Sequence, residues 1–241
     1  MEAVFKLIYN QLFITLPSPS GSYAGKTVIV TGANTGLGKE AARHFARLGA
    51  STVILAVRSL SKGEAAKSDI EATTGCGPDV IQVWSLDMCS YDSVRDFVSR
   101  VEKELPRVDI MIENAGITTF TFRRAEDGES MITINVVSTF LLASLVLPKL
   151  RETAQKFNIR PTLAIVTSDA HAWARFEERN APEGKIFEAL ADESAWVKNG
   201  RDRYLVSKLL EILAVQRIGE LYPHDTYPVT INCVNPGLCH S

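Results

Sequence analysis

The residues best suited to chemistry in this sequence are a tyrosine and a lysine four positions apart. Tyr204 and Lys208 belong to a run with a helical pattern, so their i, i+4 spacing places both side chains on one face. A phenol ionises near pH 10, so ionising it at pH 7 costs about 4 kcal/mol. An ammonium about 4 Å away supplies about 4 kcal/mol at an effective dielectric near 20. The pair could therefore move a proton, but Y-x-x-x-K is common by chance and its surroundings must decide.

A glycine-rich turn near the start of the chain offers a second chemistry, the binding of a phosphate. Residues 31–38 have the sequence TGANTGLG and lie between a strand-like run and a helical run. Gly32, Gly36 and Gly38 let the backbone turn sharply and approach a phosphate without a Cβ in the way. The free N–H groups of the helix start, with its dipole, would then bind the anion. At a first β-α junction, this pattern predicts a dinucleotide site rather than an ordinary turn.

The end of the second strand-like run indicates which dinucleotide binds. An acidic residue about 20 positions after the glycines would bind a ribose 2′-hydroxyl and favour NAD. Position 58, twenty residues past Gly38, is an arginine, and none of residues 56–59 is acidic. Arg58 can pair with a 2′-phosphate through a charge-assisted hydrogen bond. The sequence therefore favours NADP(H) over NAD(H), with a solvated surface arginine as the alternative interpretation of Arg58.

The elements that must position these residues alternate along the chain. The predicted strands are residues 26–31, 51–57, 80–85, 108–113, 162–168 and 229–235. The predicted helices are Lys39–Leu48, Ser61–Thr73, Asp92–Glu104, about 129–155, and Arg203–Leu221. The strands are continuously hydrophobic, as expected when helices cover both faces of a parallel sheet. The pattern predicts a doubly wound parallel α/β sheet, a Rossmann fold with three layers in one domain.

Further motifs follow one another in a fixed order. They are TGANTGLG at 31–38, Leu86-Asp87, Asn114-Ala115-Gly116, Asn135 in TINVVSTF, Ser168 in AIVTSDAH, Tyr204 with Lys208, and Pro236-Gly237 with Ser241. In this order the chain resembles the short-chain dehydrogenase/reductase family, over the span from Thr31 to Ser241. Within that family it is most similar to retinol-dehydrogenase-like reductases and their fungal relatives.

The resemblance implies an oxidoreductase that interconverts a carbonyl and an alcohol. The implied catalytic residues are Asn135, Ser168, Tyr204 and Lys208. Tyr204 would be the general acid or base, Ser168 would bind the substrate oxygen, and Lys208 would assist Tyr204 and hold the ribose. Asn135 would support a water that relays protons to Lys208, and NADPH would carry the hydride. The expected cofactor-binding residues are Thr31, Gly32, Asn34, Gly36, Leu37, Gly38, Arg58, Asp87, Asn114, Gly116, Tyr204, Lys208, Pro236, Gly237 and Ser241.

Three features depart from the family pattern. Glu113 stands where the family often has a second asparagine. Residues 169–203 are longer than expected and carry aromatic residues, so they could wall a substrate pocket or form a surface insertion. His171 in this stretch is expected to be structural. The chain ends at Ser241, directly after the last motif, so we expect either a truncated sequence or the absence of the part that covers the substrate.

Composition excludes several other classes of function. The chain has 241 residues, 46% hydrophobic and 22% charged, which is typical of one soluble globular domain. Its net charge of −2, with scattered basic residues, argues against nucleic-acid binding. The four cysteines show neither a C-x-x-C pair nor metal-ligand spacing, so we expect no metal site and a reducing, cytoplasmic location.

The first residues form a separate segment. Residues 3–16 are apolar but interrupted by polar side chains, too short to span a bilayer and without the pattern of a signal peptide. We expect a helix docked on the body, with contact to a membrane surface or a partner as the alternative. The sequence therefore divides into residues 1–24, an amphipathic segment with its linker, and residues 25–241, an NAD(P)-binding domain.

Two other functions remain open at this point. The first is a regulator that binds NADP without turnover, and the second is a methyltransferase that uses a similar glycine loop but has no role for Tyr204 and Lys208. The partner expected for an enzyme is a small carbonyl or alcohol compound. The aromatic residues and the resemblance favour a lipophilic or secondary-metabolite substrate, and the resemblance implies a homodimer or homotetramer.

Overall fold

The computed structural model describes residues 13, 17–237 and 239. Except for Phe13, the predictions for residues 3–16 lie outside the described residues, as does the prediction for Ser241. Six parallel strands form one sheet in the order β3-β2-β1-β4-β7-β8. They are β1 (Thr27–Thr31), β2 (Thr52–Val57), β3 (Ile81–Ser85), β4 (Ile110–Glu113), β7 (Thr162–Val166) and β8 (Thr230–Val234). All six predicted strands are therefore confirmed, and the doubly wound order places a switch point between β1 and β4.

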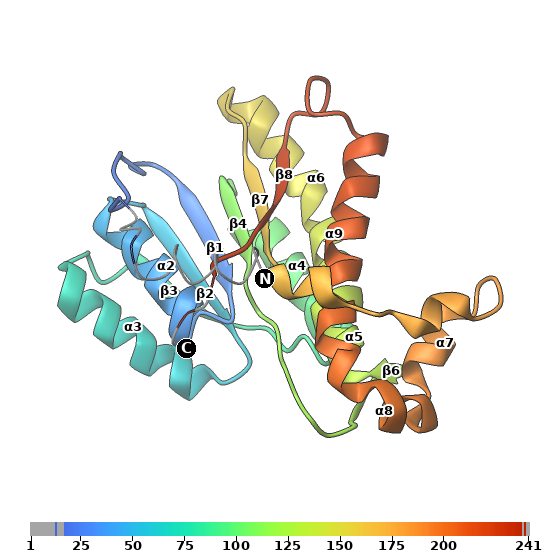
Figure 1. The fold of residues 1–241 in the computed structure, drawn as a ribbon. Helices are drawn as coiled ribbons and strands as arrows, with labels where there is room; N and C mark the ends of the chain where they lie inside the picture. Colours follow the sequence, from blue (N-terminus) through green and yellow to red (C-terminus); the bar gives the residue numbers. More distant parts are fainter. Residues whose placement is uncertain (1–12, 14–16, 238, 240–241) are drawn as a thin grey trace.

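Helices cover both faces of this sheet, as Figure 1 shows. The flanking helices are α2 (Gly36–Arg47), α3 (Leu60–Thr74), α4 (Tyr91–Glu104), α6 (Thr139–Phe157) and α9 (Arg203–Leu221). Alanines and Ile70 of α2 and α3 pack with Val28, Val30 and neighbouring strand residues on one face. Apolar residues of α4 and α6 pack with Ile29, Met111 and Leu163 on the other. Since successive strand residues point to opposite faces, the hydrophobic strands fill both layers of the core.

The helix predicted over about residues 129–155 has a different internal structure. It begins with α5 (Ser130–Ile132), continues through a π-helical turn, η1 (Thr133–Ser138), and then becomes α6. A π-turn holds one extra residue and rotates the side chains that it carries, and it is frequent at functional sites. Asn135 lies in this turn. Hydrophobic periodicity cannot locate a single widened turn, so the sequence predicted a regular helix.

The same helical run is the one membrane-span candidate among the described residues. Residues Ser130–Phe157 are long and apolar enough to cross a bilayer, with a mean hydropathy of 2.0 over the best 18-residue window. Of that window, 67% is buried inside the protein, against the sheet. This burial is what a core helix of an α/β fold requires.

The stretch after β7 folds into short helices rather than a loop. It contains η2 (Asp169–Trp173), η3 (Glu177–Asn180), α7 (Ile186–Ala191), α8 (Glu193–Asn199) and η4 (Gly200–Asp202), and leads into α9. A short hairpin of β5 (Arg124–Ala125) and β6 (Gly128–Glu129) lies beside it. We call residues 169–202 the connecting segment; Figure 1 shows α7 and α8 projecting from one side of the sheet.

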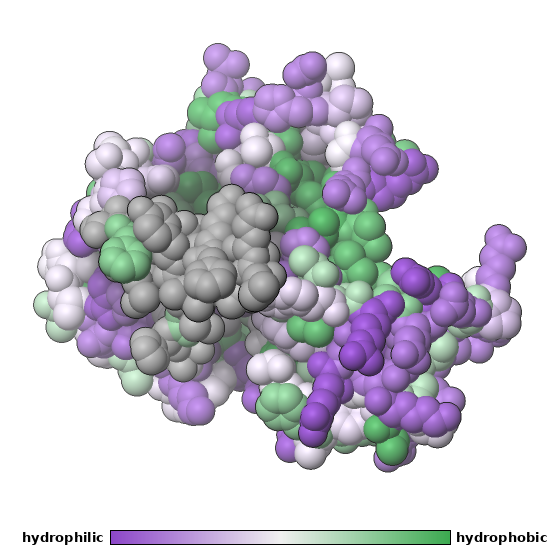
Figure 2. Space-filling model, viewed as in Figure 1, coloured by the Kyte–Doolittle hydropathy of each residue, from purple (hydrophilic) through white to green (hydrophobic). Residues whose placement is uncertain are grey.

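The connecting segment is anchored by apolar and charged contacts. Phe176 and Leu190 pack with Val206 of α9 and Ile132 of α5 in a small separate core. Glu178 and Arg203 form an ion pair at 3.1 Å, with side chains 4% and 0% exposed. In Figure 2 the surface over α7 and α8 is mostly hydrophilic, whereas apolar side chains gather along the exposed side of α9. The segment is thus fixed directly before Tyr204, at the beginning of α9.

Candidate active site

The glycine loop is closed so tightly that side chains would not fit in it. Gly32 and Gly36 have positive φ angles of 64° and 54°. A Cβ on Gly38 would lie 2.4 Å from the Asn114 Nδ2 and 2.7 Å from the Gly32 oxygen. A Cβ on Gly32 would lie 3.0 Å from the Ala115 Cα. Gly32 and Gly38 therefore allow the loop to pack against the end of β4, and Gly36 allows its turn.

Thr31 and Asn114 fasten this loop to the neighbouring strand. The Thr31 Oγ1 accepts hydrogen bonds from the backbone N–H groups of Asn114 and Ala115, at 3.0 and 2.9 Å. The Asn114 Nδ2 donates to the Thr31 carbonyl at 2.9 Å and is 3.4 Å from the Gly32 carbonyl. These bonds join β1 to β4 at the switch point of the sheet, where ligands bind in such folds.

A cleft of about 780 Å³ opens above this point, within the size range of cofactor sites. The predicted site residues that line it are Gly32, Asn34, Gly36, Leu37, Arg58, Asp87, Asn114, Gly116, Ser168, Tyr204, Lys208, Pro236 and Gly237. Three others do not line it: Thr31 and Gly38 hold the loop from behind, and Asn135 is fully buried. The structure thus brings together residues from the ends of all six strands of the main sheet and from α9.

The part of the cleft beyond β2 is positively charged. Arg58 and Lys62 both line it and are exposed, and Ser59 lies between them on the wall. Across the cleft, the Asp87 Oδ1 accepts a hydrogen bond from the Cys89 backbone N–H at 2.9 Å. The sequence reasoning missed Lys62, which lies in the first turn of α3, the helix that follows Arg58.

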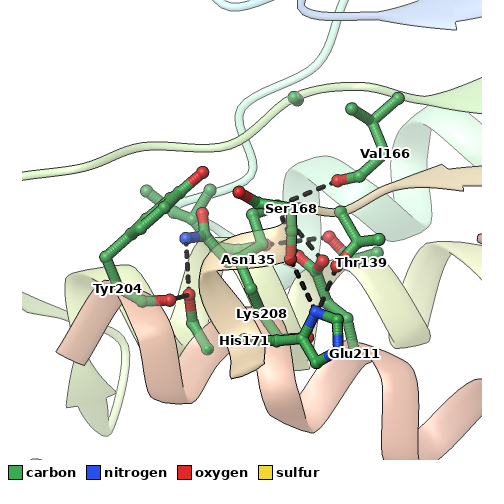
Figure 3. A network of polar contacts seen from close by, with 12 residues as sticks. Asn135, Thr139, Val166, Ser168, His171, Tyr204, Lys208 and Glu211 are labelled. Carbon is green, nitrogen blue, oxygen red and sulfur yellow. Dashed lines mark hydrogen bonds and ion pairs between the residues drawn. The ribbon is translucent and has the colours of Figure 1, made fainter. Parts of the chain in front are cut away.

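Tyr204 and Lys208 reach the same cleft from the first turns of α9, as predicted from their spacing. The Lys208 Nζ lies 5.9 Å from the centre of the Tyr204 ring. It donates to the Val166 carbonyl at 2.9 Å and lies 2.8 and 3.1 Å from the two carboxyl oxygens of Glu211. Lys208 is only 6% exposed, so this ammonium is almost fully desolvated. Figure 3 shows Tyr204, Lys208 and Glu211 on successive turns of the helix.

Two buried carboxyl groups accompany this lysine, and the sequence reasoning assigned a function to neither. Burial raises the pKa of Glu211 to about 7, and the attraction of Lys208 lowers it only in part. Burial, followed by the charge of Glu211, raises the pKa of Glu113 well above its usual range. The i, i+3 spacing of Lys208 and Glu211 on a predicted helix was a signal for their contact.

Asn135 is held in the π-turn by hydrogen bonds to the backbone. Its Oδ1 accepts from the Ile117 N–H at 2.8 Å, and its Nδ2 donates to the Ile117 carbonyl at 2.9 Å and to the Ser207 Oγ at 3.0 Å. A Cβ on Gly116 would lie 3.3 Å from the Asn135 Oδ1 and 3.8 Å from the Lys208 Nζ. Asn135 therefore joins the strand-end loop to α9 and lies near Lys208 without a direct bond to it among the described residues.

Ser168 lies at the carboxyl end of β7 with its hydroxyl in the cleft. Its Oγ accepts a hydrogen bond from the Ala170 N–H at 3.2 Å, which leaves the hydroxyl hydrogen free to donate. His171 packs one turn away, and its Nδ1 is 2.7 Å from the Ser168 carbonyl oxygen. The histidine does not line the cleft. It acts on the backbone of Ser168, as expected of a structural residue.

Comparisons with known proteins agree on one family. A family model described as short chain dehydrogenase matches residues 26–159. The short chain dehydrogenase/reductase dmxR8 of Cryptosporiopsis sp. (strain 8999) is 58% identical over 234 residues, covering 97% of this chain and 72% of the relative. The short chain dehydrogenase atnD of Emericella nidulans is 44% identical over 234 residues, covering 96% and 73%.

Solved structures lead to the same family. A short chain dehydrogenase of Escherichia coli CFT073 complexed with NADPH is 25% identical, with a TM-score of 0.66, covering 91% of this chain and 80% of that one. A short chain dehydrogenase of Shigella flexneri 2a str. 301 complexed with NADP is 26% identical, with a TM-score of 0.63, covering 89% and 77%.

Proposed function

The chain belongs to the short-chain dehydrogenase/reductase family of oxidoreductases, and on that premise we propose that it interconverts a carbonyl and an alcohol with NADP(H). One observation carries the proposal: the glycine loop and the Tyr204–Lys208 pair line the same cleft. Gly32 and Gly38 carry no Cβ where the loop meets β4, so the loop packs closely against that strand, and a phosphate would bind at the helix start that follows it. A dinucleotide would be held by the loop and by Tyr204 and Lys208, which line the same cleft.

Tyr204 and Ser168 act on the oxygen of the reacting carbonyl. When bound, the nicotinamide supplies the hydride for reduction and accepts it in oxidation. Tyr204 donates its phenolic proton to the carbonyl oxygen in reduction and removes the hydroxyl proton in oxidation. The free hydroxyl hydrogen of Ser168 binds the same oxygen as negative charge develops on it.

Lys208 and Asn135 support Tyr204 from the side away from the substrate. The Lys208 ammonium supplies positive charge that favours the ionised phenol, and its place on the cleft wall suits a contact with the ribose hydroxyls. Asn135 fixes the loop that carries Ile117, and we propose that a water binds between this loop and Lys208. Such a water would relay protons between Lys208 and solvent.

The preference for NADP(H) rests on the charge of the cleft beyond β2. Arg58 and Lys62 offer two cations to a 2′-phosphate, and no carboxylate ends β2 to bind a free 2′-hydroxyl. Two solved relatives are described as complexes with NADP or NADPH, which supports the same choice.

We also propose that the substrate is lipophilic. A hollow of about 450 Å³ lies at the connecting segment, lined by Phe120, Trp196, Val197 and Gly200 together with the cationic Lys198 and Arg201. Phe120 is 81% exposed and Val197 77% exposed, while Trp196 is packed edge-on against Phe122. An apolar carbonyl compound would cover these side chains and gain from their removal from water.

The experiment that tests this function has two steps. Thermal-shift titration with NADP, NAD and S-adenosylmethionine should give the largest stabilisation with NADP, and none with S-adenosylmethionine. NADPH consumption is then followed with a panel of aliphatic, aromatic and polycyclic ketones and aldehydes. Turnover that favours the larger apolar carbonyls is expected. Tight NADP binding with no turnover would instead identify a non-catalytic NADP-binding regulator.

A further inference from the structure

The ammonium of Lys208 is bound from behind by a carboxyl group that the proposed mechanism does not use. Glu211 lies one turn further along α9 and is 2% exposed. Its two oxygens are 2.8 and 3.1 Å from the Lys208 Nζ, and the Val166 carbonyl is 2.9 Å from the same atom. An ammonium has three hydrogen-bond donors, so at most one N–H remains for the cleft. Glu211 and Val166 therefore determine where this last donor points.

A second carboxyl group lies behind the first and has no hydrogen-bond partner among the described residues. Glu113 ends β4, is 2% exposed, and neither of its oxygens is hydrogen-bonded. A buried carboxylate without a partner is strongly disfavoured, so this group keeps its proton. The charge of Glu211 acts on Glu113 in the same direction, which shows that the two groups are electrostatically coupled.

The other charged and titratable groups around Glu211 are few. On its own helix the neighbour is Lys208, and on the sheet the neighbours are Glu113 of β4 and Cys233 of β8. Burial and the charge of Glu211 raise the pKa of the Cys233 thiol to about 11, so this thiol stays neutral. His171 lies on η2, which packs against α9, and its ring is bonded to the Ser168 carbonyl oxygen. Lys208 is thus the cation that Glu211 contacts.

We propose that Glu211 is the positioning residue of Lys208, and that Glu211 and the proton-carrying Glu113 together set how much of the Lys208 charge acts on Tyr204. The inference rests on the proposed function, because it concerns the same lysine and tyrosine. When Glu211 is protonated, Lys208 acts as a single cation. When Glu211 is ionised, the two charges form a compact pair whose field at Tyr204 is weaker. The ionisation of Glu211 therefore opposes the ionisation of the Tyr204 phenol.

The direct test is the ionisation of Tyr204 in the free protein, without cofactor or substrate. Tyrosinate absorbance is titrated with pH in the parent and in Glu211→Gln, and the signal of Tyr204 is identified as the part lost on Tyr204→Phe in each background. Gln keeps the hydrogen-bond acceptor for Lys208 but removes the charge. The Tyr204 transition should move to lower pH by about one unit or more, since an opposing charge has been removed.

The matched control is Glu220→Gln, the same substitution on the same helix. Glu220 is exposed and paired with Arg217, so the Tyr204 transition should stay where it is in the parent. An unchanged or upward-shifted transition in Glu211→Gln would overturn the proposal. Because no turnover is measured, this result is independent of whether the protein reduces carbonyls.

A second measurement uses the parent protein and does not depend on the folding of Glu211→Gln. At about pH 8, above the titration of Glu211, the infrared spectrum should still contain the C=O stretch of a protonated carboxyl group. This band should disappear in Glu113→Gln and persist in Glu220→Gln. Absence of the band in the parent would mean that Glu113 is ionised, and would contradict its role as the proton-carrying member of the pair.

Discussion

Tyr204 and Arg58 both face the cleft, but they were found by different kinds of reasoning. The role of Arg58 was inferred from its position alone, because an NAD-binding chain would have an acidic residue there. Tyr204 is informative only together with Lys208 and Ser168, because one tyrosine carries no signal. The structure adds Lys62 beside Arg58 and Glu211 behind Lys208. Glu211 lies one turn along α9 from Lys208, and Lys62 lies in the first turn of the helix that follows Arg58.

The charge of Arg58 should decide between the two nicotinamide nucleotides. In Arg58→Ala the Kd for NADP is expected to rise about tenfold or more, because a charge-assisted hydrogen bond to the 2′-phosphate is lost. The Kd for NAD should change little, as measured by fluorescence titration of both nucleotides. Arg95→Ala, which removes an exposed arginine paired with Asp92, is the control. An equal loss for both nucleotides would place Arg58 away from the 2′-phosphate.

The two buried acids should make the folded protein less stable as pH rises. Their pKa values are raised in the folded state, so their contribution is complete below about pH 4.5 and is lost as pH rises through the folded-state values. For Glu211 the rise to about 7 corresponds to about 3 kcal/mol. Urea unfolding between about pH 5 and 9 should show this decline.

Substitution of either acid should remove part of that decline. Glu211→Gln should flatten the curve between about pH 4.5 and 7, and Glu113→Gln should flatten it from about pH 4.5 to beyond pH 7. Glu220→Gln should follow the parent throughout, because its carboxyl group is exposed. If the curves of the parent and the two variants ran parallel, neither buried acid would have a different pKa in the folded and unfolded states.

At the scale of elements, the glycine loop depends on its packing against β4. In Gly38→Ala the added Cβ meets the Asn114 side chain and the Gly32 carbonyl, so the loop must shift. We expect a loss of about 1–3 kcal/mol in the free energy of unfolding and no thermal stabilisation by NADPH. Gly77→Ala is the control, because its nearest neighbour would be Val80 at 3.9 Å. Stabilisation by NADPH that equals the parent's would show that the phosphate binds elsewhere.

The connecting segment should depend on the buried pair formed by Glu178 and Arg203. Glu178→Ala leaves the Arg203 guanidinium buried without its carboxylate, which is expected to lower the free energy of unfolding by about 3–5 kcal/mol. Urea denaturation measures the change, with the exposed Glu193→Ala as control. Adding Arg203→Met should recover much of the loss. A loss below about 1 kcal/mol would mean that the pair does not anchor the segment.

The elements differ in how far the sequence could predict them. Strands and long helices follow from local patterns, so the six strands of the main sheet and helix α9 match their predicted positions. The π-turn at Asn135 does not, because one extra residue in a turn leaves the hydrophobic period almost unchanged. The short helices of the connecting segment also escaped prediction. They are held by contacts with α9, which follows them directly, and with α5, which is distant in sequence.

At the scale of the whole molecule, a parallel sheet collects its strand ends at one edge. This geometry is why the order of motifs along the sequence could predict that the glycine loop, Asn114, Ser168 and Tyr204 share one cleft. The coupling of Glu113 to Glu211 could not be predicted in this way. It depends on how α9 packs beside the sheet, which buries both Glu113 and Glu211.

The most direct test of the central claim is the transfer of deuterium from the nicotinamide of labelled NADPH to the carbonyl carbon of an apolar ketone. The parent protein should transfer the label, and Tyr204→Phe should lower kcat/KM by about 10²–10⁴-fold while NADPH still stabilises the fold. Tyr222→Phe, a half-exposed tyrosine at the other end of α9, should keep the parent rate. Transfer by Tyr204→Phe at the parent rate would contradict the proposed function.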